Sequence, residues 1–142
     1  MRTLTTPRVA GTLLVLATLL FTACGSDADP AEGGRTIELT AADAGSTLSL
    51  HPGDEIVVML ESNVTTGFAW QMEAEPASQI LDKISSEYLA PDTELVGAGG
   101  EEVWRFVATG EGTTHVGMRY ARSSGETAGE PFDFTVVVQP VR

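Results

Sequence analysis

Histidine and cysteine, which are common metal ligands and catalytic residues, are few in this 142-residue chain. Of its two histidines, His51 lies in the turn-forming stretch HPGD and His115 is out of phase with its apolar neighbours, so we expect both to face solvent. Cys24 is the single cysteine, which leaves no disulfide and no zinc-ligand pattern. No calcium-binding loop and no nucleophile elbow occur either. The sequence predicts no metal, no cofactor and no enzyme; a hydrolase with an unmarked site is the weaker alternative.

Two glycine-containing stretches are better candidates, and their chemistry is that of binding. In SNVTTGFAW, residues 62–70, Asn63 and Gly67 favour a turn, because Asn bonds to its own backbone and Gly permits positive φ. Asn63 to Thr65 also satisfies the N-glycosylation sequon, a pattern that is common by chance. GAGG at residues 97–100 lacks the Lys-Ser/Thr ending of a phosphate-binding loop and precedes a strand. Both stretches are predicted to be surface loops, whose role depends on the elements that position them.

The segment 35–142 must position these loops. It alternates apolar and polar residues with a period of two, which predicts an all-β domain. One face of each run is apolar, as in Ile56, Val58 and Leu60, and such faces can line an antiparallel, immunoglobulin-like β-sandwich. The segment 76–83 is compatible with a short helical turn. The predicted strands are 35–40, 46–50, 54–62, 67–74, 83–89, 101–109, 114–122 and 132–139.

Residues 1–23 do not belong to this domain. Two arginines precede the uncharged run from Val9 to Phe21, which is too short to span a membrane and is followed by small residues, as in a secretory signal peptide. Cys24, directly after them, resembles the cysteine of a bacterial lipobox, where cleavage leaves a lipid-modified N terminus. Phe21 stands where a lipobox usually has leucine, and ordinary secretion with cleavage near Ala23 is the alternative.

Residues 24–34 are small, polar and acidic, which predicts a flexible tether. All 20 acidic residues lie beyond residue 23, whereas two of the 8 basic residues precede it. Residues 24–142 therefore carry 6 basic and 20 acidic residues, a net charge of −14. This charge argues against a nucleic-acid partner. Contact with the membrane would then rest on the lipid. We expect an exported protein, lipid-anchored at Cys24 and facing outward from a bacterial cell membrane.

The loops and the sheet pattern together resemble the chagasin family of protein inhibitors of papain-like cysteine peptidases. The family's Asn-Pro-Thr-Thr-Gly-Phe/Tyr-x-Trp motif is matched by Asn63, Val64, Thr65, Thr66, Gly67, Phe68 and Trp70. Its Gly-x-Gly-Gly loop is matched by Gly97, Ala98, Gly99 and Gly100. The place of its third segment, Arg-Pro-Trp, is taken by Arg122, Ser123 and Ser124. The likeness covers nearly the whole of the segment 35–142, with the motifs in the same order.

The resemblance implies a sandwich whose three loops share one end and enter the cleft of a papain-like peptidase as a wedge. Thr65 and Thr66 would lie over the catalytic residues, and the backbone of residues 97–100 would follow the cleft. Phe68 is expected to be one of the peptidase-binding residues. Phe68 and Trp70 are also expected to be core residues that hold the first loop rigid.

Two departures from the family motifs affect this expectation. Val64 replaces a proline, which should loosen the first loop. Ser124 replaces a tryptophan, so an aromatic interface anchor is absent. Arg122 is either a contact within the cleft or a solvated residue at the end of a strand. We expect a monomeric, reversible, tight-binding inhibitor of papain-like cysteine peptidases, and the alternative is an envelope-anchored adhesion module without inhibitory activity.

Overall fold

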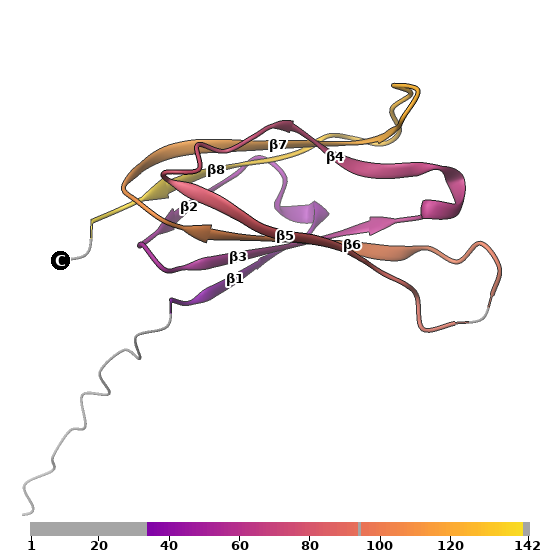
Figure 1. The fold of residues 1–142 in the computed structure, drawn as a ribbon, viewed down its shortest axis with the longest axis horizontal. Helices are drawn as coiled ribbons and strands as arrows, with labels where there is room; N and C mark the ends of the chain where they lie inside the picture. Colours follow the sequence, from indigo (N-terminus) through magenta and orange to yellow (C-terminus); the bar gives the residue numbers. More distant parts are fainter. Residues whose placement is uncertain (1–33, 94, 141–142) are drawn as a thin grey trace, which may run out of the picture.

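The computed structural model describes residues 34–93 and 95–140. The predicted signal peptide, Cys24 and the predicted tether up to residue 33 lie outside these residues. Within them, eight strands and two short 3₁₀ helices form a two-layered sandwich (Figure 1). The strands are β1 (Thr36–Leu39), β2 (Ser46–Leu50), β3 (Glu55–Ser62), β4 (Phe68–Ala74), β5 (Leu81–Leu89), β6 (Gly100–Ala108), β7 (Gly112–Arg122) and β8 (Phe132–Val138), and the helices are η1 (Ala41–Asp43) and η2 (Val64–Thr66). All eight predicted strands are confirmed, with ends that differ by a residue or two.

The strands divide into two four-stranded sheets, which confirms the predicted all-β sandwich. Sheet A has the order β1-β3-β6-β5, and sheet B has the order β2-β8-β7-β4. The inner pairings are antiparallel, whereas β1 pairs with β3 and β2 with β8 in parallel. β1 and β3 can run in the same direction because the chain between them leaves sheet A through η1, forms β2 in sheet B and then returns.

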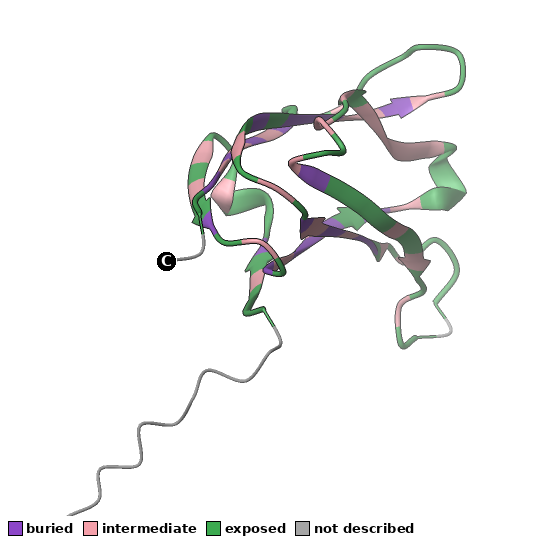
Figure 2. Ribbon diagram, turned by 60° about the vertical axis from the view of Figure 1, so that its left-hand side comes forward, coloured by how far each residue is buried: buried purple, intermediate pink, exposed green. Residues whose placement is uncertain are grey.

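The core lies between the sheets and consists of the apolar faces that the period of two predicted (Figure 2). Ile56, Val58 and Leu60 are buried, as are three phenylalanines of which Phe106 and Phe134 have ring centroids 6.1 Å apart. Trp70 packs against this core, as expected. Phe68 does not belong to it. Its position at the very start of β4 leaves the ring half-buried beyond the edge of the core.

The segment expected to contain a helical turn forms a single hydrogen-bonded turn. The Ala77 carbonyl accepts hydrogen bonds from Ile80 N at 2.8 Å and Leu81 N at 2.9 Å. β5 starts at Leu81, earlier than predicted, because this leucine is fully buried and already belongs to the sheet. In the part of the chain that the structure describes, no helix is long and apolar enough to cross a membrane.

A buried carboxylate closes the end of the sandwich where β1 begins. Asp54 accepts hydrogen bonds from Arg35 N and Arg35 Nε, both at 3.0 Å, and from His51 N at 2.9 Å. Burial alone would raise the pKa of Asp54, but hydrogen bonds from His51 and Arg35 and the Arg35 charge outweigh it and lower the pKa. These bonds tie the start of the domain to the turn before β3.

The side chains of both histidines are exposed, as the sequence predicted.

Candidate functional site

Three loops gather at the end of the sandwich opposite to the start of β1 (Figure 1). The first loop, residues 63–67, joins β3 to β4; the second, residues 90–99, joins β5 to β6; the third, residues 123–131, joins β7 to β8. The first loop lies between the other two. Asn63 Nδ2 donates to the Gly97 carbonyl at 2.8 Å, and Arg122 Nε donates to the Thr66 carbonyl at 3.1 Å. The structure thus brings together the three segments singled out in the sequence.

The first loop is closed by its own hydrogen bonds. Asn63 Oδ1 accepts from Thr65 N at 3.2 Å and Thr65 Oγ1 at 2.6 Å, while the Asn63 carbonyl accepts from Thr66 N at 3.1 Å and Thr66 Oγ1 at 2.6 Å. Gly67 has a φ of 80°, in the left-handed region that favours glycine. Since both ends of the Asn63 amide bind within the protein, its role as a turn former is favoured over glycan attachment.

Aromatic side chains support the ends of the first loop. The Tyr120 hydroxyl accepts a hydrogen bond from Asn63 N at 2.7 Å, and the Tyr120 ring stacks on Phe68 with centroids 5.4 Å apart. Trp70 Nε1 donates to the Glu61 carbonyl at 3.0 Å. Phe68 and Trp70 therefore hold the loop in place as expected, although Phe68 does so from outside the core.

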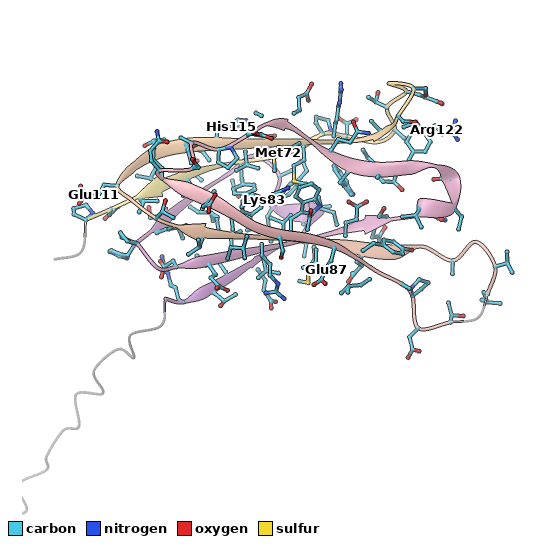
Figure 3. All side chains as sticks on the ribbon, in the orientation of Figure 1. Met72, Lys83, Glu87, Glu111, His115 and Arg122 are labelled. Carbon is cyan, nitrogen blue, oxygen red and sulfur yellow. The ribbon has the colours of Figure 1, made fainter. Side chains whose placement is uncertain are left out.

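Arg122 is neither free in solvent nor directed away from the loops. Its guanidinium lies 4.4 Å from the centre of the Phe68 ring and forms an ion pair with Glu126 at 2.7 Å, in addition to the bond to Thr66. Figure 3 shows Arg122 at the loop end of the molecule. Arg122 is therefore not a solvated residue at the end of a strand, because its side chain braces the first loop against the third. Its contact with a peptidase cleft stays a prediction.

The third loop begins with a tight turn over residues 122–126, at the place where the chagasin family motif has Arg-Pro-Trp. Gly125 N donates to the Arg122 carbonyl at 2.9 Å, and Arg122 N donates to the Glu126 carbonyl at 2.8 Å. Ser123 and Ser124 are exposed at its tip. The tip of this turn therefore exposes two small polar side chains.

The glycines of the second loop have different roles. Gly97 has a φ of 85°. A side chain on Gly100 would begin 2.1 Å from the Leu89 carbonyl oxygen, so the fold itself requires this glycine. Gly99 is exposed and lies near the Ser62 carbonyl, and Ala98 is partly buried.

Sequence reasoning missed the apolar residues beside these glycines. Leu95 is 76% exposed, Val96 is fully exposed, and Val64 of the first loop is also exposed. Isolated exposed apolar residues are common, but a group of them at one end of a domain is typical of a binding surface. The signal was an apolar Leu-Val pair inside a stretch otherwise rich in turn-forming residues.

Two buried polar residues near the first loop were also missed. Ser62 and Glu102 are buried, and Ser62 Oγ donates to Glu102 Oε1 at 2.7 Å. The available signal was their position in the strands. Ser62 lies two residues after Leu60, and Glu102 lies two residues before Trp104, so both polar residues share the inner face of sheet A with these apolar residues.

The loop end contains an open cleft with acidic residues in its lining. An open cleft of about 770 Å³ lies between the first and second loops, and its lining includes Glu61, Asp92 and Glu101. Within residues 34–93 and 95–140, no three His, Cys, Asp or Glu side chains are placed together to hold a metal ion.

Comparison with known proteins agrees with this picture. Residues 49–138 match the family described as Chagasin family peptidase inhibitor I42. Chagasin from Trypanosoma cruzi is 32% identical over 105 residues, which cover 72% of this chain and 96% of chagasin.

Solved structures share the fold. The cysteine protease inhibitor EhICP2 from Entamoeba histolytica superposes with a TM-score of 0.65 at 22% identity, covering 73% of this chain and 96% of its own. Amebosin superposes with a TM-score of 0.62 at 25% identity, covering 75% of this chain and all of amebosin. The family match spans most of the described domain, and the family consists of inhibitors and not enzymes. The chain therefore belongs to the chagasin family of peptidase inhibitors.

Proposed function

We propose that this protein is a reversible, tight-binding inhibitor of papain-like cysteine peptidases. The first loop would enter the active-site cleft, with the second and third loops on either side. The observation that carries the proposal is the first loop itself, which is prebuilt by internal hydrogen bonds and tied to both neighbouring loops. The resemblance of its motif to that of the chagasin family supports the cysteine class of peptidase.

The hydrogen bonds of the first loop also explain how it could occupy a peptidase without being cleaved. The carbonyls of Asn63, Val64 and Thr66 all accept bonds from within the protein. A nucleophile attacks a carbonyl whose oxygen can move into an oxyanion hole. Because these three oxygens are already bonded inward, the peptide bonds that follow Asn63, Val64 and Thr66 would be poor substrates.

Affinity would come from preorganisation. A flexible loop loses conformational entropy when it binds, whereas a loop already held in its bound conformation loses little. Val64 does not fix φ as proline would, but the bonds made by Asn63 and Thr66 hold the backbone at this point. The exposed side chains of Leu95 and Val96 would add apolar contact beside the cleft.

We propose that the domain acts from a membrane anchor. A signal peptide over residues 1–23, a lipid on Cys24 and a tether over residues 24–34 would export the domain and hold it facing outward. β1 begins at the end opposite to the three loops, so a tether attached there would leave the loops free (Figure 1). The single loop end predicts that one monomer binds one peptidase.

The test is a titration of residues 25–142 against papain and a cathepsin-type peptidase with a small fluorogenic substrate. We expect competitive inhibition at nanomolar concentration, a stoichiometry of one to one, and an inhibitor that remains intact. Absence of inhibition at micromolar concentration by a folded sample would contradict the proposal and favour the alternative, an adhesion module without inhibitory activity.

A further inference from the structure

Glu102 places a carboxylate at an inner-face position of sheet A, next to the point where the first loop leaves β3. The residue is 8% exposed, and β6 presents Trp104 and Phe106 at the following inner positions. A buried charge is costly unless hydrogen bonds compensate it. One oxygen, Glu102 Oε1, accepts from Ser62 Oγ at 2.7 Å and from Trp70 N at 3.0 Å.

These two donors stand at opposite ends of the first loop. Ser62 is the last residue of β3 in sheet A, and Trp70 lies near the start of β4 in sheet B. The first loop is therefore not a hairpin between paired strands, since β3 pairs with β1 and β6 whereas β4 pairs with β7. No ladder of backbone hydrogen bonds fixes the distance between its ends, which is set by how the two sheets sit on each other.

Apolar contacts between sheets are non-directional, so they fix this distance only loosely. A hydrogen bond to a carboxylate is short and directional, and stronger than one between neutral groups. Two further bonds cross between the sheets here, from Asn63 N to the Tyr120 hydroxyl and from Trp70 Nε1 to the Glu61 carbonyl. Of the three crossings, Glu102 provides the charged one, and a single oxygen of its carboxylate binds residues on both sides of the loop.

We propose that Glu102 is a positioning residue for inhibition: its carboxylate holds both ends of the first loop at the separation and orientation in which the loop binds a peptidase. This inference rests on the proposed function of the first loop. Without the carboxylate the sheets still pack, but the loop samples other conformations, and only a fraction of molecules is ready to bind.

The main test compares Glu102→Met with the unsubstituted domain. Methionine has a similar shape and is apolar, but it leaves Ser62 Oγ and Trp70 N without their acceptor, so this variant should fold with a lower melting temperature than the unsubstituted domain. We expect a folded protein whose inhibition constant for papain rises about tenfold through a slower association rate, because affinity falls with the competent fraction. Glu102→Gln keeps an acceptor oxygen in place and should recover part of the loss.

Asp54→Asn is the matched control, because Asp54 is also a buried carboxylate that accepts backbone N–H groups but lies at the opposite end. This variant should melt at a lower temperature and inhibit normally. The inference is wrong if folded Glu102→Met inhibits like the unsubstituted domain, or if the two variants lose inhibition in proportion to their loss of stability.

Amide hydrogen exchange separates this inference from the proposed function. Exchange at Thr66 N and Gly67 N should be faster in Glu102→Met and unchanged in Asp54→Asn. If the unsubstituted domain does not inhibit, the proposed function fails, while faster exchange still supports positioning by Glu102. Unchanged exchange would overturn the positioning role by itself.

Discussion

The two ends of the sandwich use similar chemistry for different results. At one end, Asp54 accepts backbone hydrogen bonds and fastens the start of the domain to the turn before β3. At the other, Glu102 fastens the ends of a loop whose tip stays exposed. The comparison shows that a buried carboxylate can serve stability at one place and the shape of a binding surface at another. Substitutions at the two ends should therefore affect different measurements.

The largest effect is expected for Gly67→Val in the first loop. A β-branched residue at a φ of 80° is strained, by about 1 to 3 kcal/mol. If the loop relaxes to relieve this strain, the inhibition constant should rise about tenfold to a hundredfold. Inhibition assays with papain would measure the change. His51→Ala, an exposed position at the opposite end, is the control, and equal losses in both variants would count against the wedge.

Asp54→Ala tests the opposite end. It leaves the backbone N–H groups of His51 and Arg35 without their acceptor, which should lower the free energy of unfolding by about 1 to 3 kcal/mol. The inhibition constant should not change at temperatures where the variant is folded. Denaturant unfolding gives the first quantity and peptidase titration the second. A loss of inhibition without a loss of stability would reverse the roles assigned to the two ends.

Asp54 also predicts a dependence of stability on pH. Its pKa in the folded state is lowered from the ordinary value of 3.8, so its contribution is fully present above that value and is lost as pH falls through the folded-state pKa. The difference in melting temperature between the unsubstituted domain and Asp54→Asn should therefore be largest near neutral pH and shrink in acid below the ordinary pKa. A difference that grows in acid would contradict this account.

The exposed apolar pair sharpens the comparison further. Replacing Leu95 and Val96 together by serine removes apolar surface expected to be covered by the peptidase, and about 1.5 kcal/mol of lost burial corresponds to a roughly tenfold rise in the inhibition constant. The melting temperature should stay the same. Ile84→Ser provides the control, because Ile84 is exposed on β5 outside the loops. Similar effects on inhibition in both proteins would argue against a contact surface at residues 95 and 96.

The smallest effect is expected for Arg122→Gln. Exposed ion pairs contribute only about 0 to 1 kcal/mol, so losing the braces to Thr66 and Glu126 should raise the inhibition constant about threefold. Arg119→Gln is a matched control, since Arg119 forms an exposed pair with Glu73 at 3.7 Å. A larger effect for Arg119 than for Arg122 would show that the bracing of the first loop is unimportant.

The sequence predicted the strands well because apolar residues alternate along them, as in β8, and alternation specifies both the strand and its orientation. Val57 in β3 and Val103 in β6 depart from this pattern, since both are buried on the outer face of sheet A. The turn at Asn63 to Gly67 was equally readable, since a residue that caps its own backbone and a glycine at positive φ are local requirements. The resemblance to a family suggested that distant loops meet, which local patterns do not contain.

Other features depend on how the two sheets and the loops meet, so they could not be predicted from the sequence. Glu102 could be seen to share a phase with Trp104, but its contact with Trp70 N in the other sheet could not. The turn of Arg122 toward Thr66 and Phe68 depends on the meeting of two loops. The parallel pairing of β1 with β3 depends on the passage of the chain through β2 in the other sheet.

The most direct test of the central claim is protection of the catalytic thiol of papain. Papain would be treated with iodoacetamide in the presence of increasing amounts of residues 25–142. The rate at which its active-site cysteine is alkylated would be measured by mass spectrometry. If the first loop fills the cleft, alkylation should slow in proportion to the fraction of papain bound, and Gly67→Val at the same concentration should protect less. An inhibited papain whose thiol is alkylated at the normal rate would contradict the account.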